Sequence, residues 1–287
     1  MEKHNFETQI RLIIMGNNEL KDFIKTVLEN MPNEWLNLTT HRLDIYNETL
    51  AKTEFLEQFE SLYKNKTNLA KLNELPTAFD YIRLGHPLSC VLEWAIAKLN
   101  GLKPENVISF SSQTTPTLAI LRKNLLTNTK TQIVYTKTLP NCFDVETIKN
   151  VYGYNFDLKK IETPKDIADF DGSTILVAEQ EDIFNLSSNG NVDFYVNNHP
   201  ELGSVIIVNG DKNGGYVSEI QHVRRRETIA MTPINCFAAL KQFTAQTPIA
   251  KKTEVETNKA AVLNSIKQIT TSNSKAVVGS SGLSIQY

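Results

Sequence analysis

The stretch YIRLGHPLSCVLEWAIAKLNG, residues 81–101, holds the most informative change of pattern in the chain. Its first seven residues include Gly85 and Pro87, which interrupt regular structure, so we expect an irregular, extended segment there. Beyond this segment, apolar residues recur at helical spacing: Val91, Leu92, Ala95, Ile96 and Leu99. The stretch therefore predicts an amphipathic helix that buries one face.

Two polar side chains precede this helix, on the irregular segment. Tyr81 and Arg83 are two residues apart. On an extended chain, a hydroxyl and a guanidinium at this spacing can both reach one phosphate group. Without wider context, an exposed loop tyrosine and a solvated arginine are the simpler interpretation.

Composition is that of an ordinary globular protein. The 287 residues are 41% hydrophobic and 22% charged, with a formal net charge of −2, which leaves room for one large α/β domain or two smaller ones. The charge argues against nucleic acid or an anionic membrane as a partner. No apolar run reaches the roughly 18 residues that a membrane span needs, and the N-terminus does not have the pattern of a secretory signal. We therefore expect a cytoplasmic protein.

Cysteine and histidine give no sign of a metal site. Cys90, Cys142 and Cys236 form no CxxC pair, and His86 has no second ligand three or four residues away. We expect each cysteine to be a small buried hydrophobic residue. The three arginines 224–226 are typical of a solvated helix face.

From residue 81 onward, strands alternate with helices. This order predicts a three-layer α/β fold, with a mostly parallel sheet covered by helices on both faces. We expect strands at 105–112, 131–137, 156–162, 173–180 and 204–210, and helices at 115–126, 144–153, 192–202, 221–243 with a break at Pro233, and 250–269.

The turn NGDKNGG, residues 209–215, interrupts this alternation. Asn-Gly and Gly-Gly pairs are strong hairpin signals, so residues 216–220 are expected to form one antiparallel strand. At the two ends of the chain we expect a strand at 7–15, helices at 19–31 and 49–72, and a strand pair at 275–287. The predicted domains are an N-terminal helical segment at 1–75, a large α/β domain at 76–240 and a truncated C-terminal part at 241–287.

Residues 81–101 resemble the Tyr-x-Arg-x-x-x-Pro…Leu-Glu…Ile-Ala-x-Leu-x-Gly signature of the pyridoxal-phosphate-dependent enzymes of cysteine and methionine metabolism. That transsulfuration family includes cystathionine synthases and lyases and the O-acetylhomoserine sulfhydrylases. Further matches follow in the family's order, namely SSQTT at 111–115, STILVAEQ at 173–180 and MTPINCFAALKQF at 231–243. The resemblance covers roughly residues 78–285, with about forty residues missing near residue 210. It implies a fold type I pyridoxal-phosphate transferase scaffold.

The resemblance also implies a cofactor-phosphate site. Ser112, Gln113 and Thr114 stand where the family's turn holds the phosphate at a helix N-terminus. Gln113 replaces a glycine that lets the backbone approach the phosphate. In the family, the residues equivalent to Tyr81 and Arg83 reach the neighbouring subunit's cofactor, so the resemblance implies a homodimer.

The rest of the implied cofactor site departs from the family. Asn209 stands where an aspartate pairs with the pyridine nitrogen, and Asn cannot supply that charge. Pro140 replaces the aromatic residue that stacks on the ring. Lys212 is the Schiff-base lysine in one register; in the other, the lysine strand is deleted and residues 209–215 form a surface hairpin. We favour the second register because it keeps the family's spacing from Glu179.

Two hypotheses follow from the resemblance. In the first, the protein is an active pyridoxal-phosphate transferase or lyase that acts on a sulfur-containing or O-acylated amino acid through Lys212. In the second, which the departures favour, it is a pseudoenzyme that is a regulatory or structural subunit, as a homodimer or beside an intact homologue. An unrelated α/β binding module is a third possibility.

Overall fold

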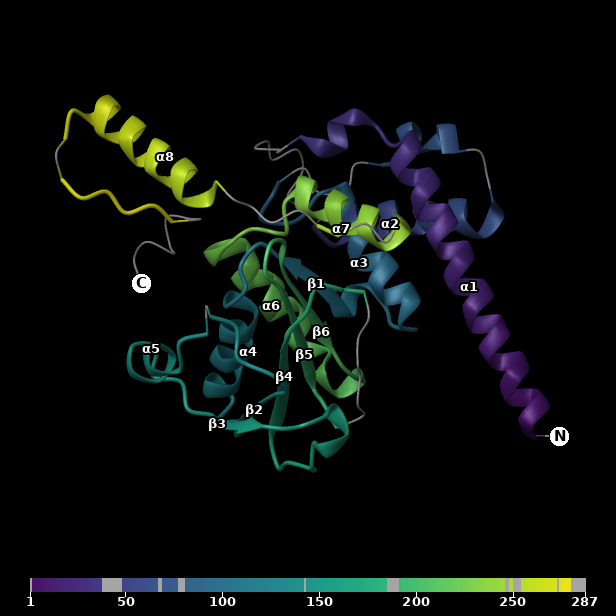
Figure 1. Ribbon diagram of the computed structural model, residues 1–287, viewed down its shortest axis with the longest axis horizontal. Coiled ribbons are helices and arrows are strands. Elements are labelled where there is room, and N and C mark those ends of the chain that lie inside the picture. The colour runs from purple at the N-terminus through teal and green to yellow at the C-terminus, as the bar shows by residue number, and fades with distance from the viewer. Residues whose placement is uncertain are drawn as a thin grey trace.

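The computed structural model of the protein describes residues 2–37, 48–66, 69–76, 81–141, 143–184, 191–245, 248–249, 254–272 and 274–279. Within these residues the chain forms an α/β structure in which one sheet has helices on both faces (Figure 1). None of the helices in this part of the chain is long and apolar enough to cross a membrane.

The sheet has six strands in the order β1-β6-β5-β4-β2-β3. Five strands point the same way, and β6 alone among the six runs antiparallel to both its neighbours. A mixed, mostly parallel sheet with one antiparallel strand is therefore present. The strands are β1 (Val107–Phe110), β2 (Thr131–Tyr135), β3 (Asp157–Lys160), β4 (Ser173–Glu179), β5 (Phe194–His199) and β6 (Gly203–Val208).

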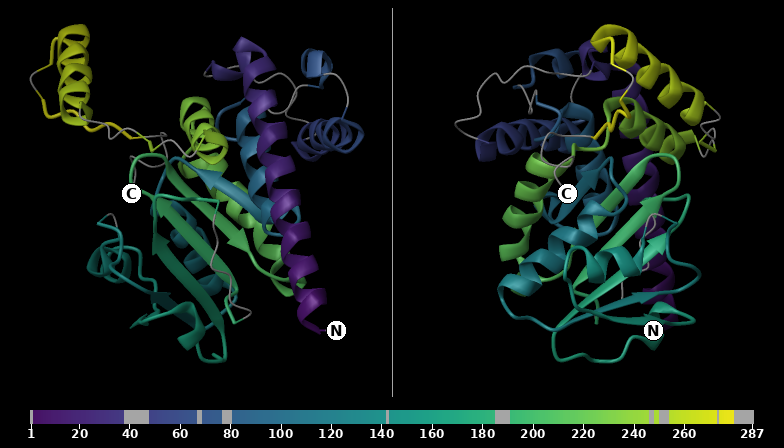
Figure 2. Two further views of the ribbon diagram at one scale, coloured as in Figure 1. Left: turned by 45° about the vertical axis from the view of Figure 1, so that its right-hand side comes forward. Right: turned by 90° about the vertical axis from the view of Figure 1, so that its left-hand side faces the viewer.

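Helices cover both faces of this sheet, as the two views in Figure 2 show. On one face lie α1 (Glu2–Asn30), α3 (Pro87–Leu99) and α7 (Pro233–Ala245), with α2 (Glu48–Asn65) beside α3. On the other face lie α4 (Thr115–Leu126), α5 (Val145–Asn150) and α6 (Gly215–Glu227). The last helix, α8 (Val255–Thr270), buries none of its residues. Short 3-10 turns complete the fold: η1 (Asn33–Leu36), η2 (Leu69–Glu74), η3 (Pro104–Asn106), η4 (Pro164–Asp166) and η5 (Asp211–Asn213).

Each face of the sheet has its own hydrophobic core. Neighbouring residues of a strand point to opposite faces, so Leu176 of β4 enters the core under α3 while Ile175 and Val177 enter the core under α4. Both faces of the central strands are buried, which explains why a strand such as GSVIIV is apolar without alternation.

Helix α3 begins at a capping box. His86 Nδ1 accepts from the amide of Ser89 at 3.2 Å, and the Ser89 hydroxyl oxygen accepts from the amide of His86 at 3.0 Å. Pro87 follows as the first helical residue, a position that needs no amide donor. The prediction of one buried face is too narrow, because α1, α2 and α7 surround this helix and bury every residue from Leu88 to Ala97.

Three predicted elements are wrong. Residues 7–15 belong to helix α1, and residues 192–202 contain strand β5 instead of a helix. Short apolar runs such as FYV do not distinguish a buried strand from a helix by periodicity. Residues 216–220 lie in helix α6, so the antiparallel strand is β6 itself. Of the predicted C-terminal strand pair, 280–287 lie outside the described residues, and 275–279 form no strand.

The predicted boundaries at residues 75 and 240 stay a prediction. The N-terminal segment shares a core with the α/β part, since Ile24 of α1 and Phe59 of α2 belong to the same buried cluster as Leu92 of α3. Rings from the three helices meet there, with the Phe59 and Trp94 centroids 5.1 Å apart.

Candidate functional site

The loop between β1 and α4 lies at the carboxyl edge of the parallel strands, where open α/β sheets bind their ligands. In this loop the Ser112 hydroxyl oxygen accepts from the amides of Thr115 at 3.1 Å and Thr114 at 3.3 Å, and from the Thr115 hydroxyl at 2.8 Å. The amides of Thr114 and Thr115, in the loop that the resemblance assigns to a phosphate, therefore already have an acceptor within the chain.

Gln113 ties the same loop to the end of β5. Its side-chain amide donates to the His199 carbonyl at 2.8 Å, and the Ser204 hydroxyl donates to the Ser112 carbonyl at 2.6 Å. The residue that replaces the family's glycine thus spans the gap from β1 to the β5–β6 turn.

Tyr81 and Arg83 lie at this same edge. The carbonyl of Ile82 accepts from residue 230, and the amide of Ser111 donates to residue 229, so segment 229–231 joins the two regions. The Arg83 guanidinium lies 5.8 Å from the centroid of the Tyr81 ring. The structure thus brings these two residues near the 111–115 loop of the same chain. Their expected role toward a neighbouring subunit's cofactor stays a prediction.

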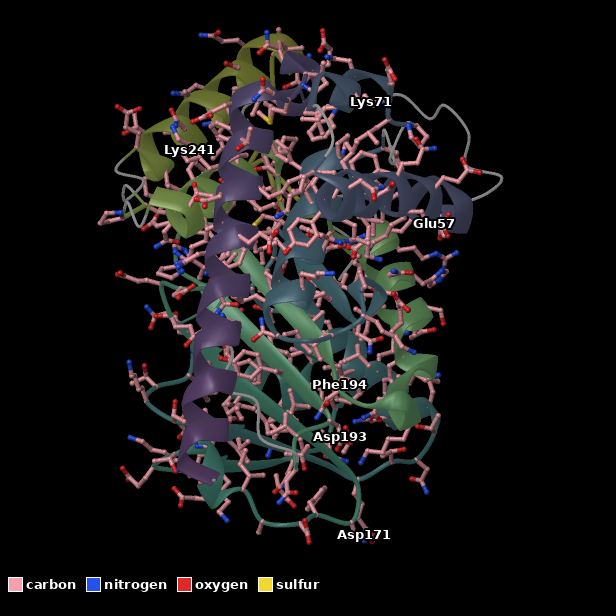
Figure 3. All side chains as sticks on the ribbon, turned by 90° about the vertical axis from the view of Figure 1, so that its right-hand side faces the viewer. Glu57, Lys71, Asp171, Asp193, Phe194 and Lys241 are labelled. Carbon is pink, nitrogen blue, oxygen red and sulfur yellow. The ribbon has the colours of Figure 1, made fainter. Side chains whose placement is uncertain are left out.

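Lys212 and Asn209 lie at the opposite ends of the strands, at the amino ends of the parallel strands. Because β6 is antiparallel, its last residue, Val208, pairs with Phe194 at the start of β5. Lys212 follows this end and forms an ion pair with Asp193 at 2.7 Å. The length of β5 separates the two edges by roughly 17 Å. Figure 3 shows Asp193 and Phe194 in the lower half of the molecule, away from Lys241 on α7.

The environment of Asp193 accounts for this ion pair. Burial favours the protonated carboxyl, but hydrogen bonds from Lys212, the Thr174 amide and Asn213 outweigh it, so the pKa of Asp193 lies below its usual range. The Asn209 side chain donates to the Val192 carbonyl at 2.6 Å. These contacts close the amino edge of β4 and β5.

The residues present therefore do not fit pyridoxal phosphate bound through Lys212. That chemistry needs the amine, the group facing the pyridine nitrogen and the phosphate cradle within one ligand's length. Lys212 and Asn209 are instead at the opposite edge from Ser112, Gln113 and Thr114, and Lys212 is directed to Asp193.

A buried charged cluster at the edge strand β1 was not foreseen from the sequence. Glu93 of α3 accepts from the amide and hydroxyl of Ser109, at 2.8 and 2.9 Å. Arg224 of α6 donates to the Ser109 carbonyl at 2.9 Å and to Glu93 at 3.1 Å. The ion pair thus occupies the outward amide and carbonyl of Ser109, which an exposed edge strand would offer to another chain.

Lys52 of α2 completes this cluster, with its ammonium 2.6 Å from the other oxygen of Glu93. Burial opposes ionisation of Glu93, but the charges of Lys52 and Arg224 outweigh it, so the pKa of Glu93 is lowered. The prediction that residues 224–226 form a solvated face is wrong for Arg224, which is 3% exposed. The signal in the sequence was a glutamate inside the apolar run CVLEWAIA.

Two cavities lie outside the 111–115 loop. The larger, of about 870 Å³, is bounded by α2, α3, η3 and α6, and Lys52 and Arg224 are in its wall. The smaller, of about 570 Å³, lies near the end of α3 and is lined by Phe184 and Phe243, whose rings stack at 4.3 Å. Neither cavity is lined by Ser112, Gln113 or Thr114.

Comparisons with known proteins identify no family. No protein-family model matches the chain, and no curated protein matches it. Among solved structures, the crystal structure of metB from Corynebacterium glutamicum is similar, with 14% sequence identity and a TM-score of 0.40. The match covers 72% of this chain and 62% of that one, so the chain spans less than two thirds of that protein's length. A likeness at this level assigns no residue and no activity.

Proposed function

We propose that this protein is a divergent relative of the pyridoxal-phosphate-dependent transsulfuration enzymes that keeps their layered scaffold without their lysine chemistry. Support for the relationship comes from the ordered motifs at 81–101, 111–115, 173–180 and 231–243. In this proposal the protein is a regulatory or structural subunit, as a homodimer or paired with an intact homologue.

One observation supports the proposed loss of the lysine chemistry. Lys212 and Asn209 lie at the amino edge of the parallel strands, while Ser112, Gln113 and Thr114 lie at the carboxyl edge. A small cofactor cannot bridge a separation of roughly 17 Å. The Ser112 hydroxyl also already accepts from the amides of Thr114 and Thr115, which lie in the loop that the resemblance assigns to the cofactor phosphate.

An absorption spectrum tests this proposal. Purified protein mixed with pyridoxal phosphate is expected to show no near-visible band of a lysine-bound cofactor and no cofactor-dependent rise in melting temperature. Lys212→Ala should give the same spectrum as the parent and as Lys130→Ala, a change at a surface lysine paired with Asp171. A band that Lys212→Ala abolishes and Lys130→Ala keeps would establish the active-enzyme hypothesis instead.

The subunit arrangement is tested separately. Tyr81 and Arg83 belong to the segment that reaches a neighbouring subunit in the family, so we expect a dimer in sedimentation at micromolar concentration. Arg83→Ala should weaken it. A monomer, alone and in the presence of an intact homologue, would contradict the proposed subunit role.

A further inference from the structure

The larger cavity lies beside the outer edge of β1, between α2 and α6. Its wall includes the apolar side chains of Leu56, Trp94, Leu102 and Val217. Figure 3 shows α2, which carries the labelled Glu57, another residue of the cavity wall. A volume of about 870 Å³ is in the range of cavities that hold small organic ligands.

The buried cluster at this cavity has two positive charges and one negative charge. Lys52, Arg224 and Glu93 have side-chain exposures of 12%, 4% and 2%. One carboxylate faces two cations, which leaves a net charge of +1 out of water. An uncompensated buried charge is costly, and an anion from outside the chain would balance it.

Hydrogen-bond donors are in excess at the same place. Glu93 Oε1 already accepts from Ser109, through both its amide and hydroxyl, and from Arg224. Lys52 has three N–H donors, and within the described residues its ammonium donates to Glu93. The Nε–H of Arg224 is buried and has no acceptor in the described part of the chain. The cluster therefore lacks an acceptor as well as a negative charge.

One of the glutamates in the cavity wall, Glu60, is already engaged. Glu60 accepts from the indole N–H of Trp94 at 2.5 Å and pairs with Lys98 at 2.7 Å and Lys64 at 3.4 Å. These contacts leave Glu60 no role as a counter-ion for Lys52. The cavity wall has five lysine and arginine residues and three glutamates, so with Glu93 beneath it the excess is again one positive charge.

We propose that this cavity binds a small organic monoanion, namely a carboxylate on an apolar or aromatic body. The carboxylate accepts from the ammonium of Lys52, and the body packs against Trp94 and Leu56. A single charge matches the excess of the cluster, whereas a phosphate monoester would bring nearly two. This binding site does not depend on the function proposed above.

Fluorescence of Trp94 provides the measurement. The chain has two tryptophans, so a Trp35→Phe background leaves Trp94 as the reporter. The probes are 3-phenylpropanoate, its neutral analogue 3-phenylpropanamide, and phenyl phosphate, with calorimetry on the unmodified full chain as a second readout. We expect the carboxylate to bind at least about 10-fold more tightly than the amide, and phenyl phosphate to bind more weakly than the carboxylate.

A matched pair of lysine variants locates the charge that is responsible. Lys52→Met keeps an apolar stem and should remove the preference for the carboxylate over the amide. Lys130→Met removes an equal charge from an exposed pair with Asp171 and should leave the preference unchanged. Urea unfolding confirms that both variants are folded.

Several results would overturn the proposal. These are equal binding of the carboxylate and the amide, no saturable binding of the carboxylate at about millimolar concentration, tighter binding of phenyl phosphate, or a Lys52→Met protein with an unchanged preference. Even if Lys52→Met does not fold, comparing the affinities of the three probes for the parent chain tests whether the cavity prefers an organic monoanion.

Discussion

Replacing Glu93 with glutamine tests whether the buried cluster holds the edge of the sheet. The glutamine side chain keeps one oxygen, which can still accept from Ser109 and Arg224 in the place of Oε1, but its amide nitrogen then faces the ammonium of Lys52. A donor faces a donor, and two buried cations lose their counter-ion. We therefore expect Glu93→Gln to weaken the junction of α2, α3, α6 and β1.

The magnitude follows from the burial of all three side chains. Removing one partner of a buried ion pair costs about 3–5 kcal/mol, because the remaining charge stays out of water. A loss of this size is a large part of the roughly 5–15 kcal/mol that stabilises a typical domain. Since the pKa of Glu93 is lowered in the folded state, its contribution is complete above the ordinary value of 4.5 and is lost as the pH falls through the folded-state pKa.

Urea unfolding followed by tryptophan fluorescence and circular dichroism gives the free energy of unfolding. Glu57→Gln, at an exposed position of α2, is the control and should change it by less than about 0.5 kcal/mol. Adding Lys52→Met to Glu93→Gln should recover part of the loss, because one uncompensated cation is removed. A loss below about 1 kcal/mol for Glu93→Gln, or simple additivity in the double variant, would refute this reasoning.

Three further predictions test other parts of the structure. Burial lowers the pKa of His86 to about 4, so the protein should lose up to about 3 kcal/mol of stability as the pH falls from 6.5 to 4. His86→Asn should flatten this dependence when the free energy of unfolding is measured across that pH range. An equally steep pH dependence in the parent and in His86→Asn would contradict the reasoning. Gly203→Ala should destabilise the protein more than Gly210→Ala. Both glycines have positive φ, but an added Cβ at Gly203 would lie 2.2 Å from the Phe110 carbonyl oxygen, whereas a Cβ at Gly210 would meet nothing within 4 Å. Equal melting temperatures of the two variants would contradict this prediction. Lys212→Ala should cost less than about 1 kcal/mol of stability, because the Lys212 side chain is 75% exposed. Asp193→Ala should cost about 1–3 kcal/mol, because it leaves the buried amide of Thr174 without an acceptor. A larger loss for Lys212→Ala than for Asp193→Ala in urea unfolding would contradict this reasoning.

Local sequence patterns were sufficient for most of the elements. The strands expected at 105–112, 131–137, 156–162, 173–180 and 204–210 overlap observed strands, and the helical spacing of apolar residues within 81–101 indicated α3. These features depend on the two-residue and 3.6-residue periods of strand and helix, which can be read from neighbouring residues. The motifs singled out Tyr81, Arg83 and the 111–115 loop, but they assign the first two to a neighbouring subunit's cofactor and do not predict that these residues lie near the loop of the same chain.

Tertiary contacts decided the rest. Residues 194–199 became strand β5 through pairing with β4 and β6. Only three residues, 200–202, join β5 to β6, so β6 must run antiparallel, and that direction sends Lys212 to the ends of the strands opposite Ser112. Glu93 and Arg224 are 131 positions apart, and neither residue type indicates a buried partner. Periodicity tells which face of an element is apolar. Whether a short apolar run becomes a strand, and which distant charges pair, are set by the packing of the whole chain, and these determine which side chains can share a site.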